Sequence, residues 1–330
     1  MGHPLRHIPE GGALVEVTLN TIQGRFLLRP DREGRVNEVV LGVLGRAQRL
    51  YGLLLMGISV LSSHLHLLAY PADAKQLSSF MRHVGGNLSK EIGLLHNWPG
   101  KLWARRYRGI RVSDEEEDQV ARLRYLLAAG VKEHLVERAI DWPGVHSARA
   151  LTRDHPLRGW WFDRSREYAA RRRGERPGRY EYATEETVIL DPLPCWAHLP
   201  IEEVRRRVKD LLRDIESEAA AERRRPSSER GRSSAATRRS VAPKKVLGVE
   251  KVMSADPHYR PEKLERSPAP DFHARRKSVR KAMREAYAWV VAAYREAAER
   301  LRAGDRLVSF PEGTFPPAFP FVPYARGQPP

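Results

Sequence analysis

Cysteine is almost absent from this chain: Cys195 is the only one among 330 residues. A single thiol excludes an internal disulfide and any cysteine-based zinc cluster. Long hydrophobic runs are missing too, because no stretch approaches the roughly 20 apolar residues that a membrane span requires. Residues 1–6 also lack the apolar core of a signal peptide. We therefore expect a cytoplasmic protein with no membrane partner.

Acidic residues are too few to balance the basic ones. Lys and Arg number 58 against 41 Asp and Glu, which gives a net charge of +17. Arginine dominates this excess, and its planar guanidinium suits paired contacts with phosphate oxygens. Nucleic acid is therefore the favoured partner, while charge alone leaves open a ribosomal, membrane-surface or simply solubilised basic protein.

Residues 12–150 alternate between strand and helix patterns. Apolar runs predict strands over 14–20, 53–61, 64–70 and 109–112. Apolar residues at helical spacing predict helices over 33–51, 73–95 and 113–130, the last with Ser113 as N-cap and Gly130 as C′ residue. This order of elements matches a ferredoxin-like split βαβ fold, an antiparallel sheet with flanking helices. We therefore expect an α+β domain.

The rest of the chain has a different composition. Residues 151–220 predict a mixed, partly helical extension. Residues 221–245 are rich in Arg and Ser, which is typical of a disordered linker. Residues 246–330 predict one long helix at 271–302 and a Pro-rich tail without regular structure. The C-terminal region should therefore be mainly helical.

Two histidines stand at alternate positions in the strand expected at 64–70. Residues two apart on a strand point to the same side. His64 and His66 should therefore project from one face, while Leu65 and Leu67 pack into the other. Two imidazoles side by side on a rigid strand are a good base for a divalent ion. The alternative is a pair of surface histidines.

Tyr125 lies away from the apolar stripe of its own helix. At 100° per residue, Val120, Leu123 and Leu127 form the stripe that faces the core. Tyr125 falls nearly opposite, so it is either an exposed residue or faces another surface. A phenol is a poor nucleophile unless a nearby cation favours its oxyanion. An ion held by His64 and His66 would supply that cation.

Aromatic and basic residues alternate just before this helix. The segment contains Trp103, Arg105, Arg106, Tyr107 and Arg108. Interleaved aromatics and arginines suit single-stranded nucleic acid, whose bases stack and whose phosphates pair with guanidinium groups. The alternative is a solvated basic loop in which Trp103 is buried.

Taken together, these motifs resemble the REP-associated tyrosine transposases, which are single-tyrosine HUH enzymes. The family carries His, a bulky hydrophobic residue and His on a strand, here His64 to His66, and a tyrosine on a later helix, here Tyr125. Residues 125–138 and Asp141-Trp142-Pro143 line up with the family's segment after the tyrosine. The Trp-x-Arg-Arg-Tyr element at 103–107 is also similar. The resemblance covers residues 12–150.

The resemblance implies a mechanism and partners. Tyr125 would attack a phosphodiester of single-stranded DNA near a hairpin or palindromic repeat, forming a 5′-phosphotyrosine and allowing strand transfer. His64 and His66 would hold Mg²⁺ or Mn²⁺, and the protein would act as a monomer or homodimer. The family places Asn or Gln as a third ligand four residues after the tyrosine, on the same helical face. Here that residue is Ala129, whose methyl group cannot coordinate a metal.

Two other functions are compatible with these residues. A weakened HUH domain would bind DNA hairpins without cutting them, as Ala129 permits. A basic RNA-binding or structural protein would have no use for His64 and His66, and would bind without regard to single-strandedness.

Overall fold

The computed structural model describes residues 5–153, 155–224, 245–262 and 270–317. The strands are β1 Val15–Asn20, β2 Leu54–Leu61, β3 His64–Tyr70, β4 Arg108–Val112, β5 Leu157–Phe162, β6 Ala183–Val188 and β7 Phe272–His273. The α-helices are α1 Arg35–Tyr51, α2 Ala74–Leu95, α3 Glu116–Leu127, α4 Ala148–Thr152, α5 Arg164–Arg172, α6 Ile201–Arg224, α7 Val249–Ser254 and α8 Lys277–Arg302.

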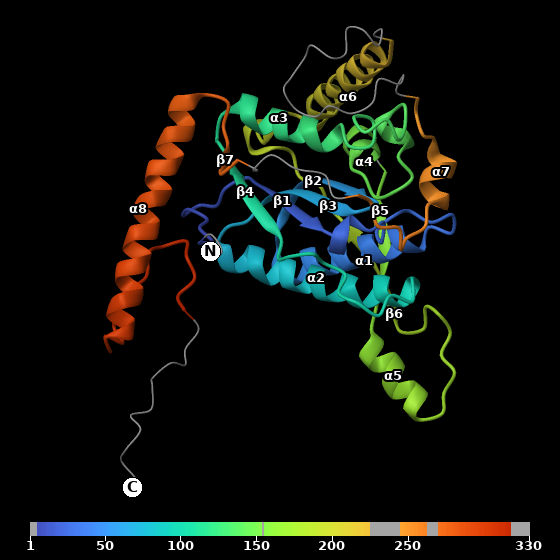
Figure 1. Cartoon of the computed structure of the whole chain (residues 1–330), viewed down its shortest axis with the longest axis horizontal. Coiled ribbons are helices and arrows are strands. Elements are labelled where there is room, and N and C mark those ends of the chain that lie inside the picture. The colour runs from blue at the N-terminus through green and yellow to red at the C-terminus, as the bar shows by residue number, and fades with distance from the viewer. Residues whose placement is uncertain (1–4, 154, 225–244, 263–269, 318–330) are drawn as a thin grey trace.

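The main sheet has the strand order β2-β3-β1-β4-β7. The first four strands are antiparallel and follow the split βαβ connection, so the predicted fold class is confirmed. In Figure 1, α1 and α2 lie on one side of this sheet and α3 and α6 on the other. β3 lies between β2 and β1, which makes the His64 strand an interior one.

Strand alternation separates two apolar clusters, one on each face. Val17, Leu65 and Leu67 are fully buried on the face that packs against α1 and α2. Leu14 and Leu68 belong to the second cluster, with Leu123 and Leu127 of α3 and the apolar stripe of α6. Because successive residues of a strand point to opposite faces, His64 and His66 lie on the α3 side.

A fifth strand from the far end of the sequence completes the sheet. β7 pairs in parallel with β4, with Arg111 opposite Phe272 and Val112 opposite His273. The backbone N–H of Ser113 then donates to the carbonyl of His273 at 3.0 Å. Because β7 runs parallel to β4, the sheet is mixed rather than wholly antiparallel as the sequence predicted.

The helix that carries Tyr125 is shorter than predicted at both ends. α3 begins at Glu116 with Glu115 as N-cap. Ser113 does not take that place, because its backbone joins the edge of the sheet and its hydroxyl donates to Asp118. The helix ends at Leu127 rather than just before Gly130. At this end, the N–H of Ala129 donates to the carbonyl of Leu126, three residues earlier in the sequence.

A hairpin after the first 150 residues packs directly on α1. β5 and β6 pair antiparallel, and α5 projects from their connection (Figure 1). Leu157, Phe162 and Val188 of the hairpin share the cluster formed by α1, α2 and the sheet. The expected extension at 151–220 is thus mixed α and β in the described residues, and it contributes to the same core.

The C-terminal region is mainly helical where it is described. The long helix expected at 271–302 is α8, which buries Val290 and Ala297. It begins at Lys277 rather than at residue 271, because residues 272–273 pair with β4 as strand β7. Of the expected linker, residues 221–224 end α6, and 225–244 lie outside the described residues. The expected tail has no helix or strand over 311–317, and the rest of it, 318–330, also lies outside them. In the described part of the chain, no helix is long and apolar enough to cross a membrane.

Candidate active site

His64 and His66 lie side by side on the α3 face of the sheet. Their ring centroids are 4.9 Å apart, with an interplanar angle of 84°. Nδ1 of His64 lies 3.0 Å from the hydroxyl oxygen of Ser63, and Nδ1 of His66 lies 3.2 Å from that of Thr18. Thr18 is directly opposite His66 in the β1–β3 register. Neighbouring hydroxyl groups therefore orient both rings.

A buried glutamate joins the site from β1. The carboxylate of Glu16 lies 3.4 Å from Nδ1 of His66, 3.4 Å from Nη1 of Arg122 and 2.6 Å from Nε2 of His273. Burial acts to raise the pKa of Glu16, but hydrogen bonds with His273 and His66 outweigh it and hold this pKa well below its usual range. Glu16 is therefore a fixed negative charge between three basic groups.

Tyr125 lies over the same face of the sheet. Its ring centroid is 5.9 Å from that of His66, at 84°, and 38% of the residue is exposed. α3 buries Leu123, Leu126 and Leu127 on its other side. The structure thus places the tyrosine against the histidine strand, which is the second of the two alternatives that the helical spacing left open. The catalytic role of Tyr125 stays a prediction.

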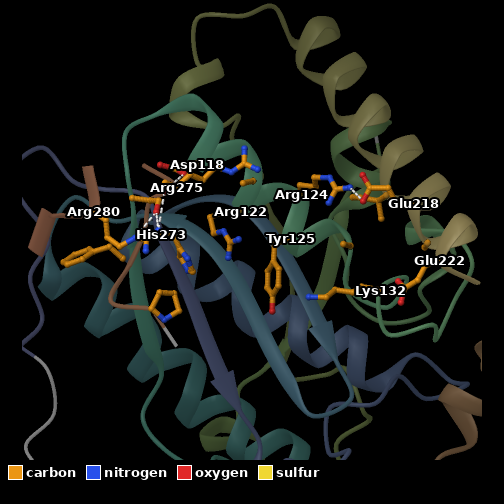
Figure 2. Close-up of a pocket in the computed structure, with 17 residues that line it drawn as sticks. Asp118, Arg122, Arg124, Tyr125, Lys132, Glu218, Glu222, His273, Arg275 and Arg280 are labelled. Carbon is orange, nitrogen blue, oxygen red and sulfur yellow. Dashed lines mark hydrogen bonds and ion pairs between the residues drawn. The ribbon is translucent and has the colours of Figure 1, made fainter. Parts of the chain in front are cut away.

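Two cations flank the phenol ring. The guanidinium carbon of Arg122 lies 4.9 Å from the ring centroid, and the Nζ of Lys132 lies 4.8 Å from it. Figure 2 shows these two side chains on either side of Tyr125 in that view. Such cation–π contacts orient the charges next to the hydroxyl-bearing ring.

Tyr125 forms part of the wall of an open pocket of about 810 Å³. The other walls come from α6 and from residues 270–280, which supply His273, Arg275 and Arg280 (Figure 2). Arg124 also lines it, but its guanidinium pairs with Glu218 of α6 at 2.6 Å. A polyanion could enter this pocket and reach Tyr125.

The predicted position of Ala129 beside Tyr125 was wrong. Tyr125, Ala128 and Lys132 line the pocket, but Ala129 does not. Ala129 is 7% exposed and belongs to the apolar cluster beneath α3. The reason is that the helix ends at Leu127, so a spacing of four residues no longer follows one face.

The basic aromatic segment begins beside the histidine strand. The N–H of Ala104 donates to the carbonyl of Asn20, and Asn20 is opposite His64. Trp103 packs against the core and donates from its indole to the carbonyl of Gly85 at 2.8 Å. Tyr107 also packs against the core.

The arginines of this segment are its exposed charged residues. Arg105, Arg106 and Arg108 are exposed, and Arg108 donates to the carbonyl of Pro270 at 3.1 Å. The DNA-binding role of Trp103, Arg105, Arg106, Tyr107 and Arg108 stays a prediction.

Three residues that contact His66 or Glu16 were missed in the sequence: Glu16, Thr18 and His273. Glu16 and Thr18 are polar residues at alternate positions in an otherwise apolar strand, and that alternation could have assigned both to the His66 face. His273 gave no comparable signal, because β7 is only two residues long and lies far along the chain from β1 and β4.

Comparison with known proteins gave few matches. No protein-family model matches the chain, and no curated protein matches it in sequence. Among solved structures, it is similar to a REP-associated tyrosine transposase bound to a REP hairpin. That match has 17% identity and a TM-score of 0.35 and covers 44% of this chain and 82% of the other.

It is also similar to a putative transposase from Deinococcus radiodurans, with 18% identity and a TM-score of 0.27, covering 37% of this chain and 95% of the other. At these TM-scores, the function has to be argued from the side chains of the site.

The donor set of the site would offer a divalent ion two protein ligands, the imidazoles of His64 and His66. Because ionised Glu16 lies next to Nδ1 of His66, a proton on that nitrogen is favoured, which leaves the Nε2 lone pair for a metal. In the described part of the chain, no group of three His, Cys, Asp or Glu side chains is arranged to hold a metal. Any further ligands would have to come from solvent or substrate.

Proposed function

We propose that this protein cleaves and rejoins single-stranded DNA at hairpin or palindromic repeats, with Tyr125 as the nucleophile. One observation carries this proposal. A tyrosine from α3 lies against His66, 5.9 Å between ring centroids, on the sheet face that also presents His64. Mg²⁺ or Mn²⁺ bound by the two imidazoles would supply a positive charge next to the phosphate.

The reaction is a phosphoryl transfer. The Tyr125 oxygen forms a bond to the phosphorus of a phosphodiester, and the bond from phosphorus to the 3′ oxygen breaks. The phenol loses its proton, and the departing 3′ oxygen gains one to become a hydroxyl. The strand is then attached through a 5′-phosphotyrosine. Attack by another 3′ hydroxyl reverses these steps and joins two strands without an external energy source.

The site's own residues supply orientation and charge. Thr18 and Glu16 hold the ring of His66, and Ser63 holds that of His64. The arginine excess of the chain favours the backbone of a nucleic acid. The exposed arginines at 105, 106 and 108 follow Ala104, which lies beside the His64 end of β3. They would hold the DNA strand that enters the site.

A denaturing gel tests the proposal. The protein is mixed with labelled single-stranded hairpin oligonucleotides taken from inverted repeats near the gene, with Mg²⁺, Mn²⁺ or EDTA. We expect a covalent protein–DNA band that depends on the divalent ion. Tyr125→Phe should abolish the band and keep non-covalent binding nearly intact, because only the nucleophilic oxygen is lost. Tyr168→Phe, at another exposed tyrosine, should leave it unchanged.

A second function is favoured by the ligand count. With two imidazoles in the described site and Ala129 buried in the core, the domain is also suited to binding DNA hairpins without cutting them. This function predicts tight, salt-sensitive binding of hairpins and no covalent band with any ion. A metal-dependent adduct in the wild-type protein would exclude it.

A further inference from the structure

Arg122 and Lys132 both lie next to Tyr125, one on α3 and one in the turn that follows it. Arg122 lies three residues before the tyrosine, almost one helical turn. Lys132 comes after the end of α3, but its N–H donates to the carbonyl of Ala128 at 2.8 Å. This hydrogen bond holds the turn after α3, from which the ammonium group of Lys132 lies over the Tyr125 ring. Both residues line the pocket with Tyr125.

The two charges are held in different ways. Arg122 is 24% exposed in its side chain and is anchored at 3.4 Å by Glu16, which also contacts His66 and His273. The Arg122–Glu16 distance of 3.4 Å is longer than the 2.6 Å between Arg124 and Glu218 on the same helix, so Glu16 holds Arg122 less closely. Lys132 is exposed, and its ammonium group lies over the phenol ring. Both cations therefore remain able to attract an anion.

Arg124 provides a contrast on the same helix. Its guanidinium pairs with Glu218 of α6 at 2.6 Å. One-to-one pairing with a carboxylate satisfies a guanidinium in a geometry that would otherwise suit phosphate. Arg122 and Lys132 are therefore the cations next to Tyr125 that can bind an anion, whereas the charge of Arg124 is matched by Glu218.

We propose that Arg122 and Lys132 form a phosphate-binding pair that holds the phosphodiester facing Tyr125. A phosphodiester has two non-bridging oxygens, and two cations on either side of the phenol ring can each approach one. This inference rests on the proposed function, since it names the groups that hold the substrate at Tyr125. It also follows that the strand binds at Tyr125 without a divalent ion.

Binding in EDTA tests the pair without requiring cleavage. In the Tyr125→Phe background, a single-stranded hairpin oligonucleotide is titrated at several salt concentrations. Lys132→Gln and Arg122→Gln should each weaken binding about five- to tenfold and reduce the salt slope by roughly 0.7, the value for one lost phosphate contact on a single strand. Lys132→Arg should restore binding. Arg124→Gln removes the same charge from the same helix and should change affinity less than about twofold.

A chemical substitution in the DNA locates the contact. Single phosphates of the oligonucleotide are replaced in turn by uncharged methylphosphonates. We expect one position at which this replacement weakens binding of the protein with Lys132 but has no further effect with Lys132→Gln. Such coupling in a double-mutant cycle shows that the two groups interact. Arg122→Gln should couple to the same position, and Arg124→Gln to none.

The outcomes separate this inference from the proposed function. Equal losses for Lys132→Gln and Arg124→Gln, or no coupled position, would overturn the phosphate-binding pair even if the wild-type protein forms a covalent adduct. Coupling at one phosphate without any adduct would support the pair and remove the nuclease function. Since Arg122 contacts buried Glu16, its variant can lose stability, and exposed Lys132 gives the decisive result.

Discussion

Glu16 links more of the site than any other single side chain. It contacts His66, which faces Tyr125, and Arg122, which flanks the same ring, and it also contacts His273 from the other end of the chain. Its side chain is 8% exposed, so these basic groups replace the water that a carboxylate otherwise requires. One acidic residue therefore orients parts of three elements.

Removing this charge should destabilise the fold. Glu16→Gln leaves Arg122 partly buried without its counterion and removes a hydrogen-bond partner of His273, so we expect a loss of about 2 to 4 kcal/mol in the free energy of unfolding. Chemical denaturation at pH 7 measures it. Glu250→Gln breaks a pair with Arg32 in which both side chains are about 70% exposed, and should cost less than about 1 kcal/mol. A similar small effect for both variants would show that Glu16 does not organise the site.

At the residue scale, the periods of strand and helix predicted which way the two histidines and the tyrosine of the site point, but not the positions of its other residues. The period of a strand placed His64 and His66 on one face, and the period of a helix placed Tyr125 opposite its core stripe. Both depend only on near neighbours in sequence. Lys132 and Ala129 could not be placed this way, because they follow the end of the helix, where one period no longer applies.

At the element scale, α1 and the β5–β6 hairpin approach each other very closely. A Cβ atom at Gly42 would lie 2.1 Å from the carbonyl carbon of Trp160, and one at Gly159 would lie 2.2 Å from the carbonyl oxygen of Glu38. The helix and the strand therefore touch through backbone at both glycines. This contact fixes the hairpin on the face of the helix opposite the main sheet.

Gly42→Ala should therefore be destabilising although alanine is the better helix former. The added methyl group meets backbone atoms that cannot rotate away, so we expect a loss of about 1 to 3 kcal/mol. Gly86→Ala in α2 is the matched control, because a Cβ there meets nothing within 4 Å. It should stabilise the protein by about 0.5 to 1 kcal/mol. Thermal unfolding of both variants would reveal the opposite signs, and a shared sign would contradict the close packing.

The sequence located elements with strong local patterns and missed those made by distant pairing. The strands and helices between residues 14 and 112 begin and end within about two residues of their expected bounds, because apolar spacing and the Asp73 N-cap are local signals. The start of α3 was misplaced because the backbone of Ser113 is used by β7, more than 150 residues later. No local pattern contains that information.

At the scale of the whole molecule, the C-terminal residues belong to the site as well as to the sheet. Pairing of β7 with β4 carries His273 to Glu16, and the N–H of Arg275 donates to the carboxylate of Asp118 at 2.8 Å. Residues 270–275 thus close one side of the Tyr125 pocket. Residues after 150 therefore contribute to the same sheet and the same pocket as residues 12–150.

Global stability should depend on pH through histidines buried in the folded chain. Burial lowers the pKa of His146 to about 4, from 6.5. Burial also lowers the pKa values of His7, His83 and His96. Each of these groups is harder to protonate in the folded state than in the unfolded state. The unfolded state therefore binds more protons as the pH falls below 6.5, and acid should unfold the protein.

The pH dependence of the free energy of unfolding can be measured for one residue, His146. It lies beneath α3, with Nδ1 accepting from the N–H of Ala148 and Nε2 3.4 Å from the carbonyl of Leu126. Its stabilising contribution is complete above pH 6.5 and is lost as the pH falls toward 4. Between pH 7 and pH 5 the free energy of unfolding should drop by about 2 kcal/mol on its account.

His146→Gln cannot titrate, so it should be less stable at pH 7 but lose about 2 kcal/mol less than the wild type over this interval. His198→Gln, at an exposed histidine, should retain the wild-type dependence. Urea titrations at the two pH values give both slopes, and an unchanged slope in His146→Gln would mean that this imidazole is not buried in its neutral form.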